Sequence, residues 1–91
     1  MLLEIHDSPV VRLNRGVAVA MAQGPDVGLA ELEMLPLDDY HLFHAVRADL
    51  LRRAGRYELA ATAYENAIAR CTNGVERRYL ERRLAEVAAG T

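Results

Sequence analysis

Residues 48–67 read ADLLRRAGRYELAATAYENA, and residues 16–35, which read GVAVAMAQGPDVGLAELEML, carry the same pattern 32 positions earlier. The matching positions are Gly16 and Ala48, Val19 and Leu51, Gly28 and Ala60, Leu32 and Tyr64, and Leu35 and Ala67. A period in the thirties indicates stacked helical hairpins, in which each pair of helices covers the apolar face of the next pair. The sequence therefore predicts an all-α fold of antiparallel helical hairpins, stacked as a right-handed superhelix of about five helices.

Start and stop signals divide the chain into these five helices, joined by short loops. We expect helices from Ser8-Pro9 to Gln23, from Pro25 to Leu35 before Pro36, from a cap at Asp38 or Asp39 to about Ala54, from Tyr57 to about Cys71, and from a capping box of Asn73 and Glu76 to Gly90. Apolar residues recur at helical spacing along each helix: Val10, Leu13, Val17 and Met21; Val27, Leu29, Ala30, Leu32 and Leu35; Leu42, Phe43, Val46, Leu50 and Leu51; Leu59, Ala60, Ala63, Tyr64, Ala67 and Ile68, the expected inner face of the fourth helix; and Tyr79, Leu80, Leu84 and Val87. The last helix then repeats the first half of a hairpin and caps the stack.

The length of the chain, 91 residues, fits one helical-repeat domain over residues 1–91. Residues 1–7 resemble the tail of a preceding helix, because they would otherwise expose apolar side chains. We therefore expect the domain to be a fragment of a longer protein.

Composition excludes several classes of protein. No apolar run approaches the roughly 20 residues of a membrane span, and the start MLLEIHDSP lacks the basic and long apolar segments of a signal peptide. Cys71 is the single cysteine, so an internal disulfide is excluded and a free thiol near a helix end is expected. We expect a cytoplasmic protein without contact to a membrane.

The central segment resembles the tetratricopeptide repeat, with a Gly-x-Tyr turn at residues 55–57 followed by Ala60, Tyr64 and Ala67. The whole string is more specific: SPVVRLNRGVAVAMAQGPDVGLAELE, YHLFHAVRADLLRRAGRYELAATAYENAIA and NGVERRYLERRLAEV. Together these segments resemble the C-terminal tetratricopeptide-like extension of bacterial RNA polymerase sigma factors of the extracytoplasmic-function class. In that family the promoter-melting and −35-reading domains precede the extension, and neither is present in this sequence.

Three arginines, Arg15, Arg47 and Arg83, occupy equivalent places in the first helices of the three units. Stacking would align them as a ladder of guanidinium groups, which suits an acidic peptide or a carboxylate of the sigma core. Pairing with nearby acids such as Glu31 or Glu65 is the other interpretation. The sequence favours pairing, because tetratricopeptide arrays usually carry an apolar residue there.

The concave side of the array is the predicted partner-binding surface. Besides the ladder, its expected residues are Leu13, Val17 and Met21 on the first helix, Asp49, Arg52 and Arg53 on the third, and Arg78 and Glu81 on the fifth. Apolar residues exposed in such a groove would form an interaction site; burial under the rest of a longer chain is the alternative.

No catalytic, cofactor-binding or metal site is predicted. His41 and His44 lie three residues apart but lack a third ligand at a suitable spacing, so we expect both to be structural. Ser8 is a helix cap, Cys71 has no evident histidine partner, and no glycine-rich phosphate loop is present.

The expected function is a regulatory interaction module of a sigma factor, not an enzyme. Its partners would be the N-terminal sigma domains in cis, or RNA polymerase or a regulator in trans, with DNA reached only through the parent protein. A free-standing adaptor that binds the tail of an unrelated protein, or a homodimerisation unit, stays open.

The isolated domain should not bind promoter DNA. Its net charge is −2, and in the run ERRYLERR the acids Glu76 and Glu81 alternate with arginines, which favours ion pairs within the helix. A titration with duplex DNA at about 50 mM salt is the strictest measurement, because counterion release favours even weak basic patches there. Micromolar binding with a steep salt dependence would contradict this interpretation.

Overall fold

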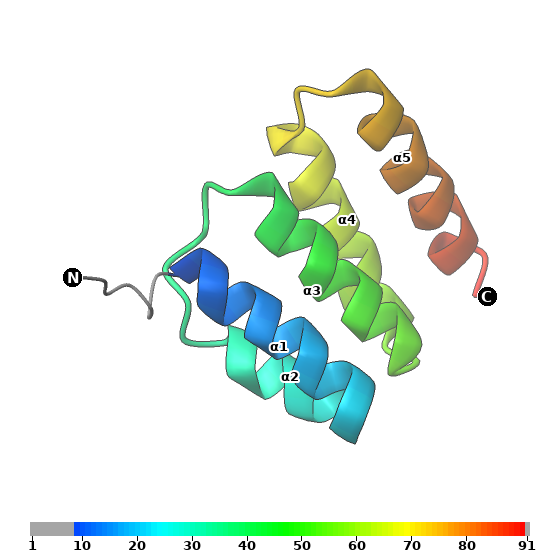
Figure 1. Ribbon diagram of the computed structural model, residues 1–91. Helices are drawn as coiled ribbons and strands as arrows, with labels where there is room; N and C mark the ends of the chain where they lie inside the picture. The colour runs from blue at the N-terminus through cyan, green and yellow to red at the C-terminus, as the bar shows by residue number, and fades with distance from the viewer. Residues whose placement is uncertain (1–8, 91) are drawn as a thin grey trace.

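The computed structural model describes residues 9–90, which form five α-helices and no strand. They are α1 (Pro9–Gln23), α2 (Pro25–Leu32), α3 (His41–Arg53), α4 (Tyr57–Arg70) and α5 (Gly74–Ala88). α1 packs on α2, α3 on α4, and α5 on α4, while α2 contacts α3 to join the two hairpins (Figure 1). The predicted all-α fold of two hairpins and a final helix is confirmed. The handedness of the stack stays a prediction, and the segment 1–7 and the cap predicted at Ser8 lie outside the described residues.

Helix ends follow the expected signals with three exceptions. α2 ends at Leu32 and not at Leu35, because a residue that precedes a proline is disfavoured in the helical conformation. α3 begins after Tyr40 without a side-chain cap, so neither Asp38 nor Asp39 caps it. Asn73 does cap α5 by accepting the Glu76 N–H at 3.0 Å, but the Glu76 carboxylate points elsewhere, so only half of the predicted capping box forms.

The turn between α3 and α4 shows why Gly55 stands between the helices of the second hairpin. Gly55 has φ +80°, a left-handed conformation that suits glycine. Its N–H donates to the Arg52 carbonyl at 3.0 Å, and the N–H of Arg56 donates to the Leu51 carbonyl at 2.9 Å. These two bonds form a Schellman motif, which satisfies carbonyl groups at the end of α3 and reverses the chain.

The core contains most of the repeated positions. Leu32 and Tyr64 are each at most 1% exposed, as are Ala48, Ala60 and Ala67. The apolar stripe predicted for α1 is only partly buried: the buried residues of this helix are Leu13, Gly16 and Ala20, whereas Val10 and Met21 of the stripe are exposed. On α4, Leu59 was expected on the inner face and is exposed, and on α2 the apolar Val27 and Ala30 are exposed as well.

The close approach of α1 and α2 explains the shifted face of α1. A Cβ atom added to Gly28 would lie 2.4 Å from the Ala20 Cβ and 2.8 Å from the Gly16 carbonyl oxygen. A Cβ atom added to Gly16 would lie 2.8 Å from the Leu32 Cδ2. The backbones therefore approach so closely that the small residues, and not the larger apolar ones, form the contact.

Alanine substitutions at three glycines should separate helix propensity from packing. Alanine is favoured over glycine in a helix by about 1 kcal/mol, whereas overpacking costs about 1–3 kcal/mol. Gly28→Ala should destabilise the domain most, because its new methyl group meets backbone, and Gly16→Ala should cost less, because the Leu32 side chain can rotate. Gly74→Ala is the control, since its nearest atom is the Arg78 Nη1 at 3.9 Å. Thermal unfolding followed by circular dichroism gives the order, and an unchanged melting temperature for Gly28→Ala would contradict this packing.

Candidate functional site

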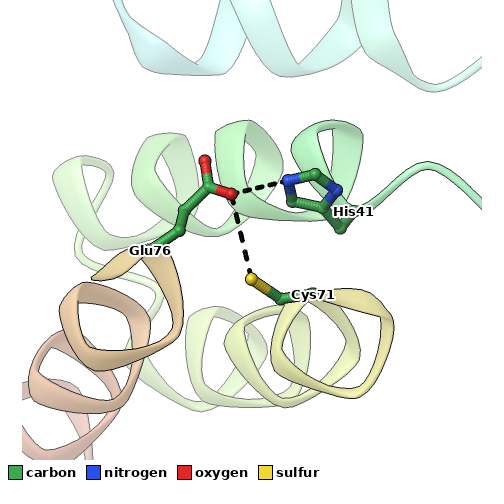
Figure 2. Close-up of side chains that lie close together, drawn as sticks. All are labelled: His41, Cys71 and Glu76. Atoms are coloured by element: carbon green, nitrogen blue, oxygen red, sulfur yellow. Dashed lines mark hydrogen bonds and ion pairs between the residues drawn. The ribbon is translucent and has the colours of Figure 1, made fainter. Parts of the chain in front are cut away.

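Two groups of polar side chains connect α5 to the hairpin of α3 and α4. The first, which we call the thiol cluster, consists of His41 at the start of α3, Cys71 directly after α4, and Glu76 in the first turn of α5 (Figure 2). The Glu76 Oε1 lies 2.7 Å from the His41 Nε2 and 3.8 Å from the Cys71 Sγ. These three atoms all lie within 4.8 Å of one another.

The loop between α4 and α5 fixes the position of this cluster. The Arg77 guanidinium donates to the Cys71 carbonyl at 2.7 Å, and the Cys71 thiol donates to the Asn73 carbonyl at 3.3 Å. Cys71 is 3% exposed, while the His41 and Glu76 side chains are about one third exposed. The cluster is therefore closed on the side of the thiol and open to solvent on the other.

Nothing in the sequence indicates that Cys71 lies near a histidine, yet His41 is close to it, with Glu76 between the two. His41 and Cys71 are 30 positions apart in the chain, and only the packing of α3, α4 and α5 brings them together. His44, in contrast, is buried and shares a 2.6 Å hydrogen bond with the Asp38 carbonyl, as expected for a structural histidine.

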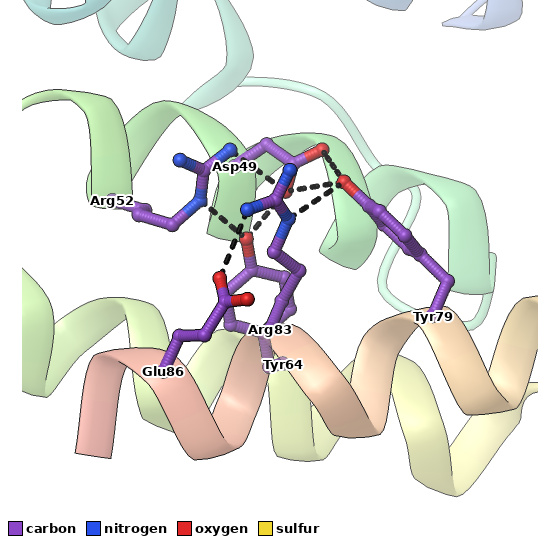
Figure 3. Close-up of polar contacts among 6 residues, drawn as sticks. All are labelled: Asp49, Arg52, Tyr64, Tyr79, Arg83 and Glu86. Carbon is purple, nitrogen blue, oxygen red and sulfur yellow. Dashed lines mark hydrogen bonds and ion pairs between the residues drawn. The ribbon is translucent and has the colours of Figure 1, made fainter. Parts of the chain in front are cut away.

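The second group, which we call the Asp49 network, connects α3, α4 and α5 farther along the helices (Figure 3). The buried Tyr64 donates its hydroxyl hydrogen to the Asp49 Oδ1 and accepts a hydrogen bond from the Arg52 Nε at 3.1 Å. Tyr79 donates to the same carboxylate, 3.3 Å from its Oδ2. The Arg83 Nε donates to the Tyr79 hydroxyl at 3.4 Å. One carboxylate thus receives hydrogen bonds from the tyrosines of two different helices.

Charge within the Asp49 network is balanced. Arg52 lies 3.8 Å from Asp49, and Arg83 forms an ion pair with Glu86 at 2.9 Å while its guanidinium lies over the Tyr79 ring. Burial, followed by the hydrogen bond to Asp49, raises the pKa of Tyr64 above its ordinary value. The hydrogen bond to Tyr64 raises the pKa of Arg52, and the bond to Tyr79 raises that of Arg83. Tyr64 therefore stays protonated at neutral pH and acts as a neutral hydroxyl donor.

The structure gives the predicted partner-binding residues four different environments. Asp49, Arg52 and Arg83 belong to the Asp49 network, so part of their hydrogen-bonding capacity is used within the domain. Arg53, Arg78, Glu81 and Met21 are exposed, whereas Val17 and Arg47 are half-buried. Leu13 is 1% exposed, so the prediction that it lines an open groove is wrong. Its side chain is core because α1 turns Leu13, Gly16 and Ala20 inward.

The three arginines of the predicted ladder, Arg15, Arg47 and Arg83, differ in their exposure and in their contacts. Arg83 pairs with a nearby acid, as the favoured interpretation expected, but that acid is Glu86 on its own helix, and Arg83 also donates to Tyr79. Arg15 is exposed on α1, and Arg47 is half-buried on α3. The sequence placed Tyr64 on the inner face of its helix but did not indicate its bond to Asp49, nor the bond from Tyr79 to Asp49 that joins α5 to α3.

Comparisons with known proteins give one relative. An uncharacterized protein of Rhizobium meliloti (strain 1021) is 42% identical over 90 residues, which are 97% of this chain and 21% of that protein. The chain thus spans about one fifth of the length of this relative. No family model matches the chain, and no solved structure does either. None of the helices that the structure describes has the length and apolar character needed to cross a membrane.

The contributions of Asp49 and Tyr64 to the free energy of unfolding should be coupled through their hydrogen bond. Asp49→Ala leaves a buried hydroxyl donor without its acceptor and should cost about 1–3 kcal/mol, whereas Tyr64→Phe removes that donor and should cost about 1 kcal/mol. The double variant should therefore lose less stability than the sum of the two. Urea unfolding of the four proteins measures the coupling. Asp39→Ala, at an exposed acid in the preceding loop, is the control; additive losses would show that the bond contributes little.

Proposed function

We propose that this chain is a protein-interaction module of a sigma factor of the extracytoplasmic-function class, which modulates transcription initiation by RNA polymerase. The observation that carries the proposal is the arrangement of the first helices of the three units. α1 contacts α3, and the Asp49 network connects α3 to α5, so these helices share one side of the stack. Such a face of successive repeat helices is the surface on which helical-repeat proteins bind peptides and domains.

Two further observations support the proposal. The small residues that carry the resemblance to the tetratricopeptide repeat are buried, Ala48 and Ala60 completely. In the Rhizobium relative the matching region is a fifth of a longer chain, as befits a module attached to other domains. The proposed partners are the promoter-binding sigma domains in cis, or RNA polymerase or a regulator in trans, in the cytoplasm. Neither catalysis nor direct DNA contact is part of the proposed role.

Exposed charges on α3 and α5 are the proposed contacts. Arg53 follows Arg52 on α3, and Arg78 and Glu81 flank Tyr79 and Leu80 on α5. All three are exposed, so they can contact a partner without any change in the packing of the core. Charged rim residues of this kind set specificity and association rate more than total affinity.

The triple variant Arg53→Gln/Arg78→Gln/Glu81→Gln tests this role. It should stay folded, because substitutions at exposed positions usually change stability by less than about 0.5 kcal/mol. The protein that carries the chain, assembled with RNA polymerase core, should show altered transcript yield in run-off transcription, and binding of the domain to the remaining sigma domains should weaken at least about fivefold. The control is Glu58→Gln/Glu65→Gln, at exposed positions of α4.

The outcomes separate the proposal from its alternatives. If the carrying protein does not bind RNA polymerase core, the sigma-factor assignment is wrong and a free-standing adaptor is favoured. If it binds core but the triple variant and the control behave like the unsubstituted protein, the sigma-factor assignment stands and the contact face is wrong. A concentration-dependent dimer, measured by analytical ultracentrifugation, would favour the dimerisation unit.

A further inference from the structure

We propose that His41, Cys71 and Glu76 form a binding site for a single zinc ion, with three protein ligands and a fourth position open to solvent. The inference does not depend on the proposed function. It begins from the convergence of three ligand types on one point: an imidazole nitrogen from α3, a thiol sulfur from the end of α4 and a carboxylate oxygen from α5 (Figure 2). Zinc accepts all three types, and sites with three protein ligands keep one position for water or another ligand.

The distances in the thiol cluster are close to those that an ion requires. Ligand atoms bound to tetrahedral zinc lie 2.0–2.3 Å from the metal and hence about 3.3–3.7 Å from one another. The distance between the Cys71 Sγ and the Glu76 Oε1 is 3.8 Å, while that between the His41 Nε2 and the same oxygen is 2.7 Å. Metal binding therefore requires the imidazole and the carboxylate to separate by about half an ångström. Both side chains are partly exposed and have room to do so.

Charge and proton balance also suit a divalent cation. In the metal-free cluster a hydrogen atom lies between the His41 Nε2 and the Glu76 carboxylate, and the Cys71 thiol donates its own hydrogen to the Asn73 carbonyl. On binding, the Cys71 thiol loses its proton to solvent, and the His41 ring carries its hydrogen on Nδ1 after exchange with solvent, so that Nε2 presents its lone pair. One thiolate, one carboxylate and a neutral imidazole then surround the ion. Two negative charges then neutralise the two positive charges of zinc. The sulfur ligand favours zinc over magnesium or calcium, which prefer oxygen.

The surroundings hold the ligands in place before the ion arrives. Asn73 accepts the backbone N–H of Glu76, and Arg77 holds the Cys71 carbonyl, so the short loop that carries two of the ligands is fixed at both ends. Supporting contacts of this kind orient metal ligands and raise affinity. A bound ion would connect the start of α3, the end of α4 and the start of α5. It would thus attach the first turn of α5 to the preceding hairpin, whereas the Asp49 network attaches α5 farther along the helix.

Titration of the tag-free, chelator-treated chain with cobalt(II) tests the site. We expect one ion per chain, an absorption band from thiolate-to-cobalt charge transfer, displacement of cobalt by zinc, and a higher melting temperature with zinc. Cys71→Ala should abolish the band. His41→Gln and Glu76→Gln should each weaken zinc binding more than about 100-fold, beyond the loss seen when only an outer partner of a ligand is removed.

Matched controls separate the site from weak binding elsewhere on the chain. Glu58→Gln and Glu65→Gln each remove an exposed carboxylate of α4 that is not in the thiol cluster, and both should keep the affinity of the unsubstituted chain. If a ligand variant loses its helical circular dichroism, alkylation of Cys71 in the unsubstituted chain replaces it: zinc should protect the thiol and magnesium should not. Absence of the charge-transfer band with excess cobalt, unchanged binding by Cys71→Ala, or alkylation unaffected by zinc would each overturn the proposal.

Discussion

The close contact of α1 with α2 through Gly16, Ala20 and Gly28 is the constraint on which the first hairpin depends. A methyl group at Gly28 would overlap an atom of the facing helix, so no larger residue fits without separating the backbones. In the second hairpin the equivalent residues are Ala48 and Ala60, both fully buried. Small residues at each crossing let short helices pack closely, and dispersion contacts along the backbones then supply stability that few large side chains provide.

The attachment of α5 relies on polar contacts to a greater extent. Only Leu80 and Val87 of this helix are buried, while its remaining surface carries arginines and glutamates. Two groups of hydrogen bonds complete the attachment, the thiol cluster at the start of the helix and the Asp49 network farther along. Because such bonds depend on direction, they fix the angle and register of α5 on the hairpin more narrowly than its small apolar face could. The final helix is thus held in one position despite its limited core.

The sequence predicted what depends on local signals and on the repeat. Prolines, glycines and the capping Asn73 gave the number of helices and most of their ends, since these residues act through their own backbone. The buried face of α1 did not follow from its apolar stripe, because that stripe includes the exposed Val10 and Met21, whereas the contact with α2 is made by Gly16 and Ala20. The thiol cluster was missed for another reason: its residues lie on three elements, and the distance between His41 and Cys71 depends on how those elements pack.

The packing of α3, α4 and α5 also decides which arginines are available to bind a partner. Residues 1–40 carry two arginines against seven acids, and residues 41–91 carry nine arginines against six acids, so the surplus of arginine lies on the second hairpin and α5. Within that half, Arg52 and Arg83 are engaged by the two tyrosines and Glu86, and Arg77 holds a backbone carbonyl. A guanidinium group that already donates to a neighbour must lose that bond, or share it, to bind a partner. The arginines that make these contacts therefore serve the fold first, and a partner that recognises positive charge on this half would meet the exposed Arg53 and Arg78 at lower cost.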